Sequence, residues 1–123
     1  MDLITTALPY ANGELHLGHI LENIQADIYN RFLKGCNINT TFISADDSHG
    51  TAISLKAKQE NISCEELIEK SKLDHETDLR KFNINFNTYG STNSKLNEEN
   101  VNLIFDTLHQ HKDIIIKDVE QAY

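Results

Sequence analysis

The feature that most constrains the fold is a long helical segment between two strand-like segments. Residues 2–8 are rich in β-branched and apolar types, which is typical of a strand, and residues 40–45 have the same character. Between them, six apolar residues recur at helical spacing in one stripe. The stripe consists of Leu17, Ile20, Leu21, Ile24, Ile28 and Phe32. Two strands joined by such a helix must run parallel, with a right-handed crossover.

Local signals set the limits of the helices. Gly35 is expected to end the first helix as a left-handed C-terminal cap. A second helix is expected over residues 51–60. Ser63 and Glu66 form a capping box, which predicts that a third helix starts there and runs to about Arg80.

The last third of the chain continues the alternation of strands and helices. Residues 82–88 alternate between apolar and polar types and are expected to form a third strand. Apolar residues at helical spacing from Val101 to Leu108 predict a last helix, and residues 114–117 a final strand. This order of elements predicts an α/β layer fold with a parallel sheet and flanking helices.

Charge and cysteine content exclude several classes of protein. The formal net charge is −8, and an acidic surface does not attract nucleic-acid phosphates. No apolar run approaches the roughly 20 residues that cross a bilayer, so no membrane partner is expected. Cys36 and Cys64 lie 28 positions apart with no CxxC pair, which predicts free thiols in a reducing compartment. Because the informative motif begins near Ala7, no presequence is expected, and the predicted location is cytoplasmic.

The first strand-to-helix junction has the character of a ligand site. In an open parallel sheet, ligands bind beyond the carboxyl ends of the strands, where helix N-termini offer unpaired N–H donors. His16 and His19 lie three residues apart at the start of the helix, on one face, and can donate hydrogen bonds to phosphate. Gly18 lacks a side chain, so a flat base could lie against the backbone there.

Two other interpretations of these residues stay open. Histidines at this spacing are often only surface residues on a helix. Alternatively, His16 and His19 could join acidic residues and a histidine from the next strand end in the metal site of a hydrolase. Those further residues are Asp46, Asp47 and His49. His75 is expected to be a packed core residue, and the histidines near the last helix end need no role.

Two longer motifs carry a resemblance to a known family. Residues 9–19 (PYANGELHLGH) resemble the HIGH signature of class I aminoacyl-tRNA synthetases. Residues 42–51 (FISADDSHGT) resemble a segment of the bacterial-type methionyl-tRNA synthetases, whereas the isoleucine, valine and leucine relatives carry a Gly-Trp-Asp segment and this chain has no Trp. The resemblance continues at Gln25–Asp27, Lys56–Ala57, Phe82–Ile84, Ile116–Lys117 and Gln121–Tyr123.

The resemblance implies that some residues of the site bind methionine and others bind ATP. Leu8 and Tyr10 match residues that pack around a methionine side chain, and Asp47 matches the carboxylate that binds its ammonium group. Asp46 is a neighbour that either joins the site or caps the following helix. The residues that match the ATP-facing part are Pro9, Asn12, Gly13, His16, Gly18 and His19.

The implied reaction is the activation of methionine by Mg-ATP, followed by transfer to tRNA(Met). The methionine carboxylate attacks the α-phosphate and pyrophosphate leaves, so the protein must orient the reactants and stabilise charge on phosphate. His16 and His19 are the implied catalytic residues. A catalytically inactive adenine-nucleotide-binding module is an alternative function.

By this resemblance, residues 1–123 are the N-terminal part of a Rossmann-like catalytic domain. The connective insert with its zinc-binding cysteines, the KMSKS loop and the anticodon-binding region have no match in the sequence. We therefore expect no zinc in this portion, tRNA contacts through other regions, and association with a complementary C-terminal portion. The chain alone is expected to be inactive or weakly active.

Overall fold

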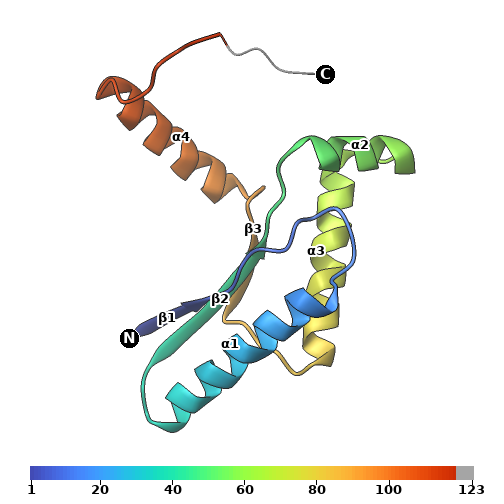
Figure 1. Cartoon of the computed structure of the whole chain (residues 1–123), viewed down its shortest axis with the longest axis vertical. Helices are drawn as coiled ribbons and strands as arrows, with labels where there is room; N and C mark the ends of the chain where they lie inside the picture. The colour runs from blue at the N-terminus through green and yellow to red at the C-terminus, as the bar shows by residue number, and fades with distance from the viewer. Residues whose placement is uncertain (119–123) are drawn as a thin grey trace. The chain divides into compact units, whose positions relative to one another are not determined.

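The computed structural model describes residues 1–118, in two compact units that divide after Asn93 (Figure 1). Gln121–Tyr123, one of the segments that carry the resemblance, lies outside the described residues. The second unit contains α4 (Lys95–Gln110), as the apolar spacing predicts. The first unit contains β1 (Asp2–Thr5), α1 (Leu17–Gly35), β2 (Thr40–Asp46), α2 (Thr51–Glu60), α3 (Cys64–Lys81) and β3 (Thr88–Ser91).

The sheet of the first unit confirms the predicted α/β fold. Its strand order is β1-β2-β3, and both pairs are parallel, with Ile4 opposite Phe42 and Ser44 opposite Tyr89. Helix α1 connects the parallel strands β1 and β2, while α2 and α3 connect β2 and β3 (Figure 1). None of the helices in residues 1–118 combines the length and apolar character that crossing a membrane requires.

The core lies on one face of the sheet. Alternate residues of β2 are buried, and Phe42 at the centre of the strand is fully enclosed. Leu33 from α1 and Leu79 from α3 pack against this row, so both helices cover the same face. The complete cluster is Ile4, Leu33, Phe42, Leu79, Ile84 and Tyr89.

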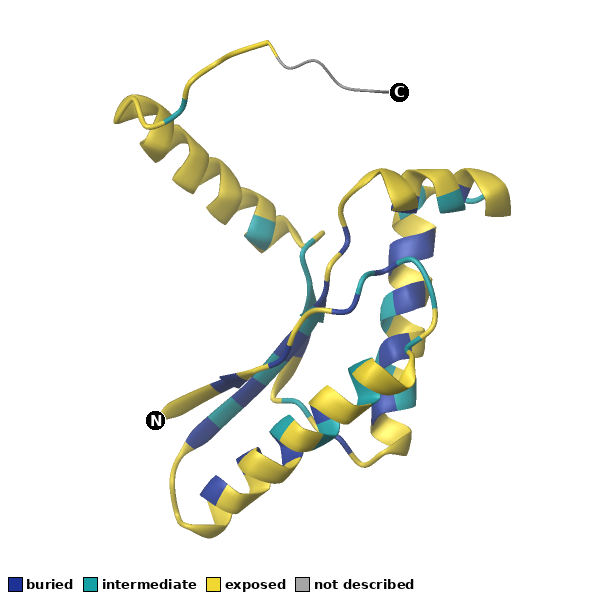
Figure 2. Cartoon of the chain, viewed as in Figure 1, coloured by how far each residue is buried: buried dark blue, intermediate teal, exposed yellow. Residues whose placement is uncertain are grey.

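Helix α1 turns a polar face toward the sheet, contrary to its apolar stripe. Leu17, Leu21, Ile28 and Phe32 of the stripe are exposed, whereas the buried residues of α1 are Asn23, Asp27, Asn30 and Leu33 (Figure 2). The buried amides are satisfied by hydroxyls of the sheet side. Thr6 donates to Asn23 at 3.1 Å and Thr40 donates to Asn30 at 2.7 Å. Burial of these polar groups is tolerated because they are hydrogen-bonded.

The helix ends differ from the prediction in one detail. Gly35 is the last residue of α1 and does not adopt a positive φ; Asn37 does, at 58°. The Ile38 N–H donates to the Leu33 carbonyl at 3.0 Å and the Asn37 N–H to the Lys34 carbonyl at 3.0 Å. This is a Schellman end, in which asparagine can take the left-handed position because its short polar side chain tolerates it.

Two predicted strands differ from the structure: the third strand is present but lies at Thr88–Ser91, and the strand at residues 114–117 is wrong. Residues 82–88 leave α3 through an irregular segment, and pairing with β2 begins only at Thr88. Their alternation reflects the burial of Ile84 and the partial burial of Phe86 against the core, which needs no backbone ladder. Residues 114–117 form no strand either, because β-propensity alone does not supply the partner strand that backbone pairing requires.

Candidate active site

The loop after β1 is joined to the end of β2 by backbone hydrogen bonds. The Ala11 N–H donates to the Asp47 carbonyl at 2.8 Å, and the Asp47 N–H donates to the Pro9 carbonyl at 2.8 Å. Tyr10 and Asp47 thus form an isolated parallel bridge beyond the two strands. The structure therefore brings together Tyr10 and Asp47, two of the residues predicted to contact one ligand. Asp47 is exposed and Tyr10 is half-buried.

Gly50 lies close to the predicted site residue Tyr10 and was not among the residues predicted from the sequence. A Cβ atom at this position would lie 2.6 Å from the hydroxyl oxygen of Tyr10, and the φ of Gly50 is 122°. The backbone conformation therefore favours glycine, and a Cβ atom would also have to displace the Tyr10 hydroxyl. The His-Gly-Thr sequence at positions 49–51 was the available signal, because a glycine directly before a helix often marks a special backbone geometry.

His16 and His19 cap the N-terminus of α1 reciprocally. Nδ1 of His16 accepts from the Gly18 N–H at 3.1 Å and from the His19 N–H at 3.4 Å. Nδ1 of His19 accepts from the His16 N–H at 3.3 Å. The rings stack with centroids 3.6 Å apart. The first N–H groups of the helix were predicted to be available to phosphate. An imidazole partly occupies them instead.

This capping fixes the tautomers of the two histidines. A ring nitrogen that accepts a hydrogen bond carries no proton, so each neutral imidazole bears its proton on Nε2. Within the described residues, neither Nε2 atom has a hydrogen-bond partner, so both are free to donate. Burial lowers the pKa of His19, and the neighbouring His16 lowers it further, which favours the neutral ring.

Gly18 lies directly beneath the ring of His16. A Cβ atom at position 18 would lie 2.9 Å from Cε1 of His16 and 3.0 Å from its Nδ1. A side chain here would displace the capping imidazole. Gly18 is therefore needed for the histidine cap itself, whatever else approaches the backbone at this point.

Asp46 is a buried anchor and does not cap α2. The N-cap residue of that helix is Gly50, which has no side-chain cap. Oδ1 of Asp46 lies 2.9 Å from Nδ1 of His75 and accepts a hydrogen bond from the Tyr89 hydroxyl, while Oδ2 has no partner in the described part of the chain. His75 is buried, as expected of a core residue, but it packs through polar contacts.

The remaining predicted residues are distributed around this loop. Pro9 is buried, Asn12 and Gly13 are half-buried, and Leu8 is 42% exposed. Nε2 of His49 lies 3.0 Å from the Thr92 carbonyl. No group of three or more His, Cys, Asp or Glu residues among residues 1–118 is arranged to hold a metal ion, so the hydrolase cluster is not assembled.

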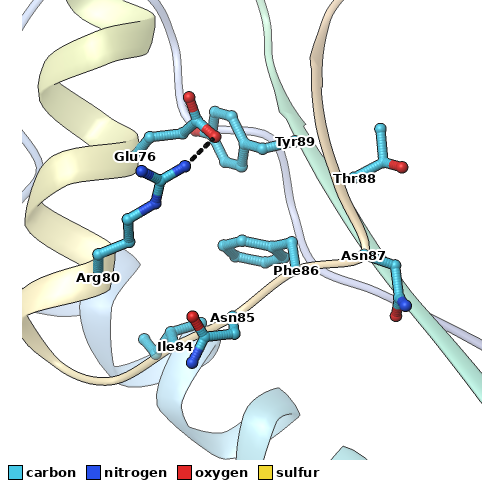
Figure 3. Close-up of a pocket in the computed structure, with 8 residues that line it drawn as sticks. All are labelled: Glu76, Arg80, Ile84, Asn85, Phe86, Asn87, Thr88 and Tyr89. Atoms are coloured by element: carbon cyan, nitrogen blue, oxygen red, sulfur yellow. Dashed lines mark hydrogen bonds and ion pairs between the residues drawn. The ribbon is translucent and has the colours of Figure 1, made fainter.

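A separate open cavity of about 320 Å³ lies between the C-terminal half of α3 and the segment leading into β3 (Figure 3). Glu76 and Arg80, 3.3 Å apart, stand on its helical side, and Phe86 lies opposite them. None of the predicted site residues lines this cavity, and we assign no ligand to it.

Comparison with known proteins decides the family. A family model described as tRNA synthetases class I (M) matches residues 2–123. The chain belongs to the class I methionyl-tRNA synthetase family. Over 121 residues it is 49% identical to the methionine–tRNA ligase of Blochmanniella floridana, 47% to that of Psychrobacter sp. (strain PRwf-1) and 41% to that of Myxococcus xanthus (strain DK1622).

The match covers only part of these synthetases. It spans 98% of this chain but 22% of the Blochmanniella floridana protein and 17% of the other two, so the chain spans about a fifth of the length of the curated relatives it matches. Among solved structures, Mycobacterium tuberculosis methionyl-tRNA synthetase bound by methionyl-adenylate superposes with a TM-score of 0.74 over 76% of this chain and 19% of that chain, at 24% identity. At this identity, the likeness shows only that the fold is shared.

Proposed function

We propose that the chain is the N-terminal part of the catalytic domain of a methionine–tRNA ligase, which activates methionine with ATP and transfers it to tRNA(Met). The observation that carries the proposal is the identity of 41–49% to methionine–tRNA ligases over 98% of the chain. The site geometry supports it, because Tyr10 and Asp47 are neighbours at the same sheet end as the histidine cap.

Methionine is the proposed ligand of Leu8, Tyr10 and Asp47. The exposed carboxylate of Asp47 can pair with the substrate ammonium group in a charge-assisted hydrogen bond. The ring of Tyr10 and the exposed side chain of Leu8 offer apolar contact to a flexible thioether. The Tyr10–Asp47 bridge supports one ligand reaching both residues.

ATP, as its Mg complex, is the proposed substrate of the loop and the helix start. The Nε2–H groups of His16 and His19 are proposed to donate to phosphate oxygens as negative charge develops on them. Stacking of the rings keeps the two donors close, at a centroid distance of 3.6 Å. The loop residues proposed to frame the nucleotide are Pro9, Asn12, Gly13 and Gly18.

Other regions of the synthetase complete this function. A lysine loop, the second half of the nucleotide fold and an anticodon-binding region are proposed to come from a complementary portion, with which this chain associates, and tRNA binds there. The proposed compartment is the cytoplasm, whose reducing conditions keep Cys36 and Cys64 as the free thiols seen here.

The test is amino-acid-dependent ATP–pyrophosphate exchange by this chain, alone and with the C-terminal portion of a methionyl-tRNA synthetase. Methionine, isoleucine, leucine and valine are compared side by side. We expect exchange with methionine only, and only after complementation. Preference for another amino acid would overturn the specificity. Nucleotide binding without exchange, in halves shown to associate, would instead make the chain a binding module.

A further inference from the structure

Three successive backbone carbonyls of the loop each accept a hydrogen bond from a side chain of α2 or α3. Ser71 Oγ donates to the Ala11 carbonyl at 3.3 Å. Lys56 Nζ donates to the Asn12 carbonyl at 2.5 Å. His75 Nε2 contacts the Gly13 carbonyl at 2.6 Å. We call Lys56, Ser71 and His75 the carbonyl clamp.

The two helices that carry the clamp residues pack against each other. Ser71 and His75 are four positions apart on α3, so they lie on the same face of that helix. Helix α2, which carries Lys56, packs on α3 through a buried cluster beneath the loop. That cluster consists of Ala11, Ile53, Ala57, Leu67 and Ile68. A loop carbonyl held by such helices has little freedom to move.

With Asp46 as a carboxylate, the two contacts of His75 call for a doubly protonated ring. A backbone carbonyl only accepts, and an ionised carboxylate only accepts, so Gly13 and Asp46 both need a donor from His75. Tyr89 already uses its own proton on the same Asp46 oxygen. An imidazolium satisfies both contacts and neutralises the buried carboxylate, which would be strongly unfavourable if left unpaired.

We propose that the carbonyl clamp positions the ligand-binding loop for methionine activation, with the His75 imidazolium linking the Gly13 carbonyl to Asp46 at the end of β2. This inference rests on the proposed function. The clamp residues are positioning residues, because they act through the backbone between Tyr10 and His16. No residue of the clamp is among those predicted from the sequence to touch substrate.

The charges around His75 come from every element that packs against it. Asp46 on β2 and Asp74 on α3 are acidic, and Tyr89 on β3 is a neutral donor. On α1, the pKa of His19 is lowered by burial, by His16 and by His75 itself. Burial lowers the pKa of His75, but its contacts with Asp46 and Gly13 outweigh burial and raise the pKa above 6.5. The His75 ring therefore keeps its second proton to a higher pH than an ordinary histidine does.

The first experiment reads the proton on His75 directly. Ring nitrogen chemical shifts of His75 are followed by NMR in the 123-residue chain as pH is raised. We expect both nitrogens of His75 to keep their protons as the pH rises through 6.5, the ordinary value for histidine. A neutral His75 ring at pH values near 6.5 or below would overturn the imidazolium link. This measurement needs no variant and no activity.

The second experiment reads positioning in the complemented exchange assay. We expect His75→Gln to lower kcat about 10–10²-fold at pH 6.5, as small misplacements of reacting groups do. The wild-type-to-variant ratio should fall toward 1 as pH rises, because the wild-type ring loses its proton. A ratio that stays constant with pH would indicate only a structural role and overturn the proposal. His109→Gln is the matched control.

Lys56 tests the clamp without any titrating imidazole. Lys56→Met should lower kcat in the same assay, and Lys56→Arg should restore part of it, because a guanidinium can still donate to the Asn12 carbonyl. Lys58→Met, an exposed lysine on the same helix, should match wild type. Equal activity of Lys56→Met and Lys58→Met would remove Lys56 from the clamp. If the wild-type protein shows no methionine-dependent exchange, the proposed function fails, and the NMR titration still judges the His75 link.

Discussion

The hydroxyl of Tyr89 on β3 donates its hydrogen bond to the carboxylate of Asp46 at the end of the neighbouring strand β2. Asp46 is fully buried, and its second oxygen has no hydrogen-bond partner among the described residues. Burial and the hydrogen bond to Asp46 raise the pKa of Tyr89 well above its ordinary range, so the phenol stays a donor. Among the described residues, Tyr89 and His75 are the side chains that hydrogen-bond this carboxylate.

Removing this hydroxyl should be costly for stability. We expect Tyr89→Phe to lower the free energy of unfolding by about 1–3 kcal/mol, because it takes a donor from a buried charged acceptor. Urea denaturation measures the change. Tyr29→Phe, on an exposed side chain of α1, should stay within about 0.5 kcal/mol of wild type. Equal effects of the two substitutions would contradict the role of the Tyr89 hydrogen bond.

The raised pKa of His75 makes stability depend on pH with a defined sign. The folded state binds the proton more tightly than the unfolded state, so the stabilisation is fully present below pH 6.5 and is lost as pH rises through the raised pKa. Denaturant unfolding at a series of pH values should show the difference between wild type and His75→Gln shrinking with increasing pH. A difference that grows over this range would show that the sign is wrong; His109→Gln controls for loss of any histidine.

His19 should be required for the chemistry proposed here. In a complemented enzyme, we expect His19→Ala to reduce methionine-dependent exchange on the order of 10²–10³-fold, as loss of one oxyanion donor does. Activity within about threefold of wild type would remove His19 from that role. The melting temperature is measured in parallel, because His19 also accepts the His16 N–H. His111→Ala, outside the first unit, is the control.

Two leucines of α1 test which face of the helix packs. Leu33 is 6% exposed and Leu21 is 56% exposed, although only Leu21 belongs to the apolar stripe. We expect Leu33→Ala to lower the free energy of unfolding of this chain by about 2–5 kcal/mol, and Leu21→Ala by about 0.5 kcal/mol or less. The reverse order in urea denaturation would mean that the stripe, and not the polar face, packs on the sheet.

The left-handed residue after α1 gives a backbone test. Asn37→Ala should destabilise the chain by about 1 kcal/mol, since alanine has neither the local hydrogen bonding of asparagine nor the freedom of glycine at a φ of 58°. Asn37→Gly should be neutral or slightly stabilising. Asn39→Ala, which changes an exposed asparagine without a positive φ, provides the comparison in thermal unfolding.

Patterns in the sequence predicted where helices and strands lie better than they predicted which face of each element is buried. The strand–helix–strand order and the capping box at Ser63 were confirmed because each depends on residues close together in the chain. The buried face of α1 was missed because Asn23 and Asn30 are stabilised by Thr6 and Thr40, which lie outside the helix, 17 and 10 positions away. Hydrophobic periodicity does not register a polar face that is satisfied by distant hydroxyls.

The same limit applies to the site. Motifs brought attention to Tyr10 and Asp47, and the structure makes them neighbours. His75 could be predicted to be buried, but its contacts with Asp46 and Gly13 join residues 29 and 62 positions away. Such contacts exist only once the sheet and α3 are assembled, and no spacing rule within one segment contains them.

The hydrogen bonds to the loop carbonyls also bear on how the chain ages. Asn12 precedes Gly13, and deamidation at such a pair requires the glycine nitrogen to swing onto the asparagine side-chain carbon. Lys56 holds the Asn12 carbonyl, which precedes that nitrogen, and His75 contacts the Gly13 carbonyl, which follows it. These contacts restrain the rotation that ring closure needs. We therefore expect the one Asn-Gly pair in the sequence to deamidate more slowly in the folded chain than in the unfolded chain.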